Sequence, residues 1–276
     1  MNAVLKDIRD NRILWLLAIL PVLLGAKLWR PEAHTLLFVL SVLAIVPLAA
    51  LLSHATESVA AKTGDTLGGL LNATLGNLTE LIIALTALRA GQYLLVKASI
   101  AGAIVTNSLF MLGASFLLGG LKHHVQDYNQ SSARLQAGLL FLATVAMIIP
   151  SVLAEADSAT ANESFIQMLS VGLSALLIVT YGLGMVFSLK THKEFFSAKH
   201  AAAHEASWPL RTSLATLAIV TILVALVSEV FVESVQYAAA AFGMTAAFVG
   251  LSSWLWWAAR PKWCPRFPAP ARTGWT

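Results

Sequence analysis

The chain has 276 residues and a formal net charge of +4, and 58% of its residues are apolar while 12% are charged. An average soluble domain is about 25% charged, so this composition argues against an ordinary soluble protein and favours a membrane protein. The single cysteine, Cys264, excludes a disulfide within the chain and a metal cluster built from cysteines.

The apolar stretches predict seven helices, and three of these stretches contain no Asp, Glu, Lys or Arg: residues 98–121, 135–154 and 164–189. Each is as long as the ~20 residues that cross the hydrocarbon core of a bilayer. We therefore predict an all-α polytopic membrane protein with about seven transmembrane helices. The expected helices are residues 13–29, 34–60, 67–90, 93–120, 133–154, 164–189 and 212–242.

Basic residues set the predicted topology, because Lys and Arg favour the cytoplasmic side of a membrane. The N-terminus is therefore expected in the cytoplasm, and the protein in the cell (inner) membrane. Loop 155–163 has acids but no basic residue, so it is expected outside. Pro21 and Lys27 interrupt the first apolar stretch, which we expect to be an uncleaved span rather than a signal peptide. The basic residues used are Lys6, Arg9, Arg12, Lys122, Arg134, Lys190, Lys193, Lys199 and Arg211.

The second expected helix, 34–60, carries the first of four carboxylates that lie within predicted spans, Glu57. An acid at the centre of a membrane helix costs roughly 2.5 to 3.5 kcal/mol, so such residues persist where they face a cavity, an ion or a partner. His54 precedes Glu57 by three residues, and such a pair is a candidate proton relay. A polar patch at the helix end is the open alternative.

The third expected helix, 67–90, carries the strongest candidate site, in the segment LLNATLGNLTELIIALTAL at residues 70–88. As part of one continuous helix, Glu80 would lie about 20 Å beyond Leu67, past the membrane midplane. Asn72, Gly76 and Glu80 are spaced by four residues and Asn77 precedes Glu80 by three, so all would share one broad face. Their oxygen atoms suit a hard cation. A hydrogen-bonded contact between helices is the alternative, and for Asn72 it stays open.

Two later helices add candidates. Asn107, in helix 93–120, is expected to face the same cavity as Glu80, whereas its small neighbours Gly102 and Gly113 fit close helix packing. In helix 212–242, Glu229 and Glu233 share a face and are expected to attract ions toward the site or to pass protons to it. Glu233 lies close enough to the helix end that interfacial exposure is an equal alternative.

The segment NATLGNLTELIIALTAL resembles the first of two hallmark repeats of the calcium/proton exchanger family, within the cation/calcium exchanger superfamily. The family's Gly-Asn-x-x-Glu motif corresponds to Gly76, Asn77 and Glu80, and the segments FSLKTHKEFFS and SEVFVESVQ are also similar to family sequence. The resemblance covers residues from about 35 to 251. It implies an eleven-helix fold with one leading helix and two inverted five-helix repeats, of which this chain resembles the N-terminal part.

The resemblance also implies a function and a site. A cation, Ca²⁺ first with Mn²⁺ and Na⁺ as alternatives, would be exchanged for H⁺ near the membrane midplane, with no cofactor. Glu80 would be the principal ligand and proton carrier, and Asn77, the Gly76 carbonyl and Asn107 would complete this half of the site. Inverted repeats with central binding sites are a general design of transporters.

On this basis the chain divides into five segments. They are residues 1–33 with the first transmembrane helix, 34–189 as the first exchanger repeat, 190–211 as a cytoplasmic loop, 212–251 as the start of the second repeat, and the tail 252–276.

The tail departs from the family pattern. It holds five of the eight tryptophans and no acid, and no second Gly-Asn-x-x-Glu segment follows Leu251. An interfacial Trp anchor and a disordered Pro-rich tail are two interpretations. We expect instead that the chain is truncated or frameshifted after about Leu251 and lacks half of the ion site. The alternative function is therefore a non-transporting half-exchanger or partner subunit, acting as a homo-oligomer or paired with a second half.

Other function classes find little support. The spans contain no Asp pair, His-Glu-x-x-His or Gly-x-Ser-x-Gly motif, so the chain is not expected to be an enzyme. The basic residues are dispersed along the loops, and nucleic-acid binding is not expected. The expected partners are membrane lipids, Ca²⁺ and protons.

Overall fold

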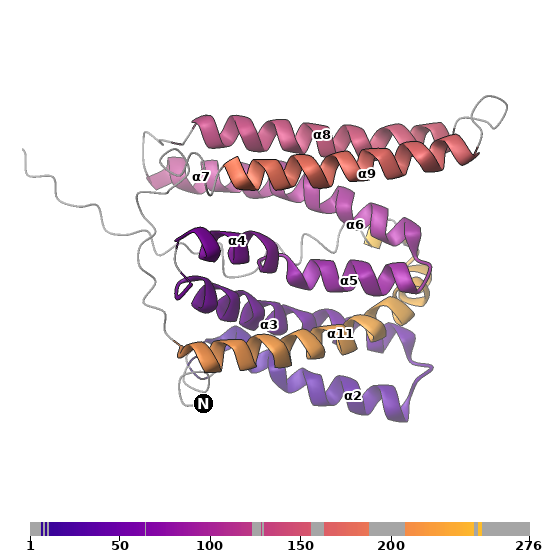
Figure 1. Cartoon of the computed structure of the whole chain (residues 1–276). Coiled ribbons are helices and arrows are strands. Elements are labelled where there is room, and N and C mark those ends of the chain that lie inside the picture. The colour runs from indigo at the N-terminus through magenta and orange to yellow at the C-terminus, as the bar shows by residue number, and fades with distance from the viewer. Residues whose placement is uncertain are drawn as a thin grey trace, which may run out of the picture. The chain divides into compact units, whose positions relative to one another are not determined.

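The computed structural model describes residues 7, 9, 11–63, 65–122, 128, 130–155, 163–187, 208–245 and 248–249. Within this part of the chain all regular structure is helical, which confirms the all-α prediction (Figure 1). Loop residues 190–207 and the tail 252–276 lie outside the described residues. The elements are η1 (Arg12–Ala18), α2 (Ile19–Trp29), α3 (His34–Ala60), α4 (Asp65–Leu75), α5 (Leu78–Arg89), α6 (Tyr93–Val105), η2 (Thr106–Met111), α7 (Leu112–Lys122), α8 (Gln130–Glu155), α9 (Glu163–Val186) and α11 (Leu210–Ala241).

Six of the helical segments in the described residues are long and apolar enough to cross a membrane. They agree with six of the seven expected helices, and the chain is a multi-pass membrane protein. The seventh, expected over residues 67–90, is divided into α4 and α5. The six are Arg12–Trp29, His34–Ala60, Tyr93–Leu121, Gln130–Ala154, Ser164–Val186 and Leu210–Ala241.

The chain forms two compact units, and each has its own helix packing. The first comprises residues 1–113 with 202–276, and the second comprises residues 114–201. The second unit contains α8 and α9, which pack against each other. The first contains the larger buried core and all of the candidate site residues.

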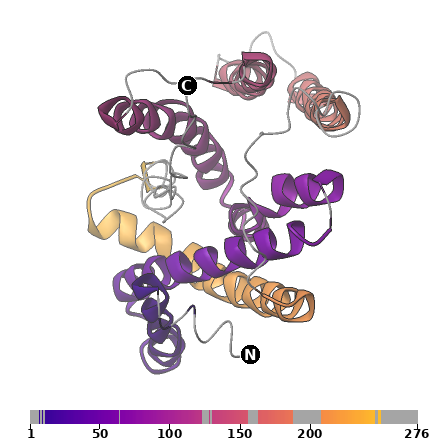
Figure 2. The same ribbon diagram turned by 90° about the vertical axis from the view of Figure 1, so that its left-hand side faces the viewer.

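The first unit is centred on α3 and α11, which pack along their length in antiparallel directions (Figure 1; Figure 2). The buried side chains of the pair include small polar residues, among them Ser41 and Ser228, which let the two backbones approach closely. Two ring contacts run in opposite order along the two helices: His34 with Tyr237 at 4.0 Å and Phe38 with Phe231 at 5.6 Å between centroids. A third continues the order, His54 of α3 with Trp208, just before α11, at 4.5 Å.

Glycines end two helices of this unit. Gly91 follows α5 with φ of 72°, and Gly243 follows α11 with φ of 65°. These left-handed conformations are costly for a residue with a Cβ atom. After each glycine the next backbone N–H returns to the helix, from Gln92 to the Ala87 carbonyl at 2.9 Å and from Met244 to the Ala239 carbonyl at 2.8 Å. Both helices therefore stop in the arrangement that glycine favours at a C-terminus.

Candidate functional site

The candidate site is built around a break between α4 and α5, which Figure 1 shows as two separate ribbons. The expectation of one continuous helix over residues 67–90 is therefore wrong. Gly76 and Asn77 lie between the two helices. Glycine is a frequent residue after a helix end and asparagine is a favoured residue before a helix start, so the pair Gly-Asn allows one helix to stop and another to begin.

Gly76 is required at the break by close contact with its own preceding turn. Its N–H donates to the carbonyl of Asn72 at 3.0 Å. A Cβ atom built on Gly76 would collide with that same carbonyl oxygen, which is rigid backbone. A residue with a side chain would therefore force the break to change shape.

Glu80 lies in the first turn of α5. The shared face predicted for Asn72, Gly76 and Glu80 assumed an unbroken helix, and the break removes that geometry. The carboxylate instead belongs to the first turn of α5, at the N-terminal end of that helix. Its Oε2 atom is shielded from solvent, so this oxygen is buried although the residue as a whole is half-buried. The adjacent Thr79 is 2% exposed and helps to fix the first turn in the core.

Asn77 precedes the first residue of α5, yet its side chain makes no capping hydrogen bond. It is exposed, and its carbonyl oxygen accepts the N–H of Leu81 at 3.0 Å. The last carbonyls of a helix have no partners within it and carry partial negative charge. The C-terminal end of α4 is therefore followed directly in the chain by the helix start that carries Glu80. Cation sites in transporters are commonly built from such discontinuous helices.

Asn107 lies on a different element from the other three predicted ligands. It is in η2, a π-helical turn between α6 and α7, and its side chain is exposed, whereas the adjacent Thr106 is buried. Such π-helical turns are frequent at functional sites. The structure therefore places Gly76, Asn77 and Glu80 at one break between helices and Asn107 on a separate helical segment, η2.

The residues predicted as a proton relay have other partners. Glu57 is exposed and accepts a hydrogen bond from Ser53 through Oε1 at 3.2 Å. His54 Nδ1 lies 3.4 Å from Asp7 Oδ2, and its ring packs against Trp208. Sequence spacing alone did not indicate the contact with Asp7, because it joins segments far apart in the chain.

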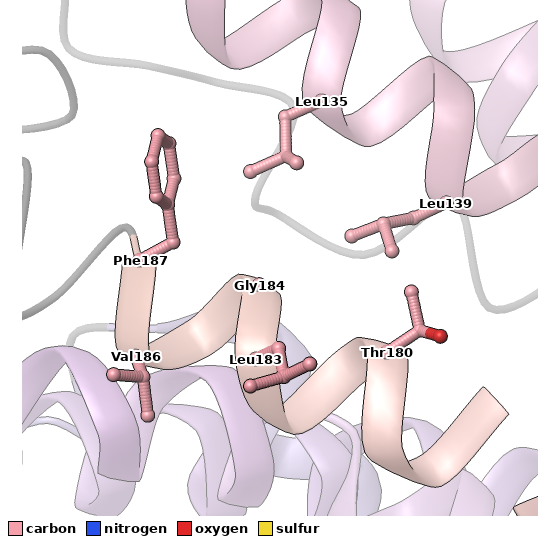
Figure 3. Close-up of a pocket in the computed structure, with 7 residues that line it drawn as sticks. All are labelled: Leu135, Leu139, Thr180, Leu183, Gly184, Val186 and Phe187. Carbon is pink, nitrogen blue, oxygen red and sulfur yellow. The ribbon is translucent and has the colours of Figure 1, made fainter. Parts of the chain in front are cut away.

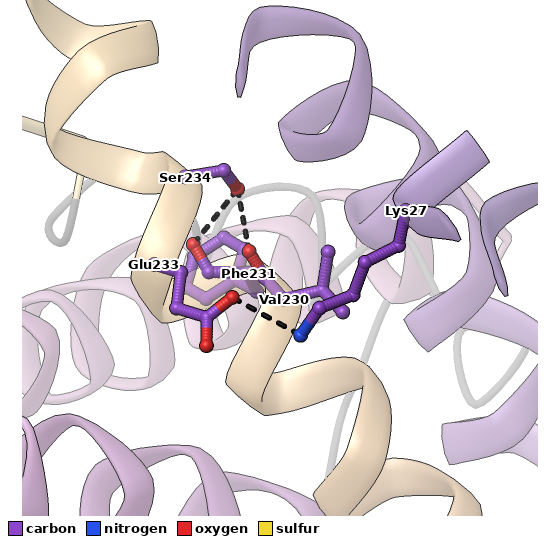
Figure 4. Close-up of polar contacts among 5 residues, drawn as sticks. All are labelled: Lys27, Val230, Phe231, Glu233 and Ser234. Carbon is purple, nitrogen blue, oxygen red and sulfur yellow. Dashed lines mark hydrogen bonds and ion pairs between the residues drawn. The ribbon is translucent and has the colours of Figure 1, made fainter. Parts of the chain in front are cut away.

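The two acids of α11 differ in their surroundings. Glu229 is exposed. Glu233 Oε2 lies 3.1 Å from the Nζ atom of Lys27, a residue of α2 that interrupts the first apolar stretch of the sequence (Figure 4). The sequence indicated this pair only by a basic residue near the end of one span and an acid near the end of another.

Other places for a bound ion are few in the described residues. No three His, Cys, Asp or Glu side chains gather there closely enough to hold a metal ion. A hollow of about 450 Å³ lies between α8 and α9 in the second unit, and its lining is almost entirely apolar (Figure 3). Such a surface does not replace the hydration shell of a cation. The lining residues are Leu135, Leu139, Thr180, Leu183, Gly184, Val186 and Phe187.

Comparison with known proteins gives consistent similarities. The model of the family described as "Sodium/calcium exchanger protein" matches residues 33–190. The Ca(2+)/H(+) antiporter of Aphanothece halophytica is 38% identical over 252 residues, which cover 86% of this chain and 67% of that protein. The Ca(2+)/H(+) antiporter ChaA of Bacillus subtilis is 36% identical over 249 residues, or 87% of this chain and 69% of that protein. The solved structure of native YfkE aligns with a TM-score of 0.70 and 31% identity, over 87% of this chain and 67% of that chain.

Proposed function

Because the chain belongs to the sodium/calcium exchanger protein family, we propose that it is a cation/proton antiporter that carries Ca²⁺ in exchange for H⁺. The relatives named Ca(2+)/H(+) antiporter support both the cargo and the coupling ion. In this proposal the N-terminus is cytoplasmic, residues 34–189 form the first exchanger repeat, and residues 212–251 belong to the second. No cofactor takes part.

The observation that carries the proposal is the placement of Glu80 at the break between α4 and α5. Glu80 is in the first turn of α5, and the C-terminal end of α4 directly precedes α5 in the chain. A carboxylate binds either a proton or a cation, so occupancy by H⁺ and by Ca²⁺ is mutually exclusive at the same oxygens. This exclusion couples the two ions, provided that the site opens to one side of the membrane at a time.

The remaining ligands in the proposal are the carbonyl of Gly76, the side-chain oxygen of Asn77 and Asn107. The absence of a capping bond at Asn77 leaves its amide oxygen available to an ion. Glu57 and Glu229 are exposed acids on α3 and α11, and we assign them to the pathway, where they attract cations toward the site. His54 takes part as a proton-handling group beside Glu57.

The decisive experiment measures Ca²⁺ uptake into proteoliposomes under an imposed pH gradient. The parent protein is expected to take up Ca²⁺, and Glu80→Gln is expected to abolish uptake because the neutral amide cannot exchange a proton for a cation. Glu32→Gln, a change at an exposed acid in the turn before α3, is the matched control and should transport normally. Normal uptake by Glu80→Gln would refute the assignment of Glu80.

A second candidate function is a half-exchanger that needs a partner polypeptide. The sequence contains one Gly-Asn-x-x-Glu segment, and Ca²⁺ takes about 6 to 8 oxygen ligands, more than the proposed donors supply. In this case the rest of the site comes from another chain, either a second copy or a separate second half. The initial rate of uptake is measured at several protein-to-lipid ratios. A rate that rises more steeply than in proportion to the ratio would support the paired form, and a proportional rise would support a site complete in one chain.

A further inference from the structure

The N-terminal helical segment, η1 with α2, packs onto the central helix pair. Leu14 of η1 is 3% exposed, and Leu23 of α2 is fully buried. Both η1 and α2 pack against α3. Apolar burial of this kind fixes the segment to α3 but does not by itself connect it to α11.

Two polar contacts make that connection. Near the start of both segments, Trp208 donates its indole N–H to Asp7 Oδ2 at 2.7 Å, and Trp208 is 1% exposed. A buried indole N–H needs an acceptor, and Asp7 supplies it. The bond joins the residues just before η1 to the residues just before α11.

The second contact lies toward the far ends of the same segments, where Lys27 Nζ is 3.1 Å from Glu233 Oε2. Figure 4 shows the Lys27 side chain extending toward α11 to meet this carboxylate. The neighbouring Ser234 turns its hydroxyl back to the carbonyls of Val230 and Phe231, at 2.7 and 3.1 Å. Ser234 thus bonds within α11, whereas the adjacent Glu233 contacts a residue of another helix.

The two contacts are separated by about the thickness of a membrane. Trp208 and Glu233 are 25 residues apart in sequence, which is about 37 Å along a helix at 1.5 Å per residue, against ~30 Å for a hydrocarbon core. The N-terminal segment and α11 thus run in the same direction and are joined near both of their ends.

A counter-charge at this depth has a physical reason. Lys27 and Glu233 both lie within helical segments that are long and apolar enough to cross a membrane, and their side chains are 36% and 64% exposed. An unpaired acid within a membrane helix is costly, and pairing with a base reduces that cost. The pair therefore favours a fixed position of α2 against α11 more strongly than an ion pair in water does.

We propose that Lys27 and Glu233 are positioning residues that fasten the N-terminal segment to α11, with Asp7 and Trp208 as the matching attachment at the other end. The segment then moves together with α11 when the ion site changes sides, and Glu233 is not part of the ion pathway. This inference rests on the proposed antiport function, but the attachment itself can be measured without transport.

A double-mutant cycle tests the attachment. Lys27→Met, Glu233→Gln, the double variant and the charge swap Lys27→Glu with Glu233→Lys are compared in thermal unfolding and in Ca²⁺ uptake. Either single change is expected to lower the maximal rate about threefold with the apparent KM for Ca²⁺ unchanged, and the charge swap should restore the rate. The pair Lys62→Met and Glu32→Gln, at two exposed residues of different turns, is the control and should show no coupling. Additive effects of Lys27 and Glu233 on unfolding, or a raised KM in Glu233→Gln, would overturn the proposal.

A reversible cross-link tests whether the segment and α11 move together. Lys27→Cys and Glu233→Cys are combined with Cys264→Ser, which removes the single native cysteine, and are joined by a short bis-thiosulfonate reagent, which forms a disulfide with each thiol and releases sulfinate. Uptake within twofold of the uncross-linked protein supports common movement, whereas loss of uptake that a reductant reverses overturns it. If the parent protein shows no uptake, the antiport proposal fails, while the coupling measured by unfolding still decides whether the attachment exists.

Discussion

The backbone carbonyl of Asn72 lies so close to the α-carbon of Gly76 that no Cβ atom fits between them. Gly76→Ala is therefore expected to disturb the break between α4 and α5 and to displace Glu80. Because the obstacle is backbone rather than a flexible side chain, we expect a cost of about 1 to 3 kcal/mol in unfolding free energy and a loss of Ca²⁺ uptake. Thermal unfolding and proteoliposome uptake measure the two effects.

Two other glycines of the same unit provide the control for this change. A Cβ atom on Gly25 or Gly113 would meet nothing within 4 Å. Both are within helices, where alanine is the better helix former by about 1 kcal/mol. Gly25→Ala and Gly113→Ala should therefore keep or raise stability, and a loss as large as that of Gly76→Ala would show that steric contact is not the cause.

Glu80→Asp separates the charge of the site residue from its reach. The shorter side chain keeps the carboxylate but withdraws it toward the α5 backbone, so we expect Ca²⁺ binding to weaken about tenfold or more rather than vanish. Isothermal titration of the purified protein with Ca²⁺ measures this, with Glu80→Gln as the variant that should not bind. Equal affinity in the parent and in both variants would place the ion elsewhere.

The exposed acid Glu229 is predicted to act on ion capture. Neutralising it in Glu229→Gln removes an attractive charge without touching the proposed ligands, so the apparent KM for Ca²⁺ should rise while the maximal rate stays the same. The effect should shrink at high ionic strength, because salt screens exposed charges. Uptake kinetics at low and high salt test this, and a salt-independent change would point to a structural cause.

The contact between α3 and α11 is expected to be the main source of stability in the first unit. Leu48 is fully buried there, so Leu48→Ala should lower the unfolding free energy by about 2 to 5 kcal/mol. Leu43 on the same helix is 37% exposed, and Leu43→Ala should cost much less. Comparable losses in the two variants would show that this interface is not tightly packed in the membrane.

The hydrogen bond between Trp208 and Asp7 is expected to be measurable by itself. Trp208→Phe keeps most of the buried ring area but removes the N–H donor, and Asp7→Asn keeps an acceptor oxygen but removes the charge. A bond to a charged group contributes about 1.5 to 3 kcal/mol, so the two changes should be strongly non-additive in thermal unfolding. Additivity would mean that the two side chains do not interact in the membrane-embedded protein.

Much of the helix pattern could be predicted from sequence because a membrane helix must bury its own backbone polar groups, and long apolar stretches reveal it. Helix 34–60 was predicted with the bounds that α3 has, and 212–242 agrees with α11 to within two residues at each end. The prediction of a continuous helix over residues 67–90 was wrong, since hydropathy does not detect a local break in a helix. The pair Gly76–Asn77 carried that signal in its conformational preferences, and the apolar residues on both sides obscured it.

The candidate ligands were chosen from residue type and spacing alone, which identified Glu80 as an acid in an apolar surrounding. Spacing could not place Glu80 in the first turn of a new helix, and it did not predict that Glu233 pairs with Lys27. Those distinctions depend on residues distant in the chain.

By itself the sequence determined a helical membrane protein with an acid-bearing Gly-Asn-x-x-Glu segment, because the cost of placing charge and bare backbone in lipid restricts which residues can occur there. Tertiary structure alone decided that α11 lies antiparallel to α3, that Lys27 meets Glu233, and that Asp7 accepts from Trp208. Each of these contacts joins segments that lie about 150 or more residues apart in the chain, and their geometry follows from the way the helices pack rather than from any local pattern.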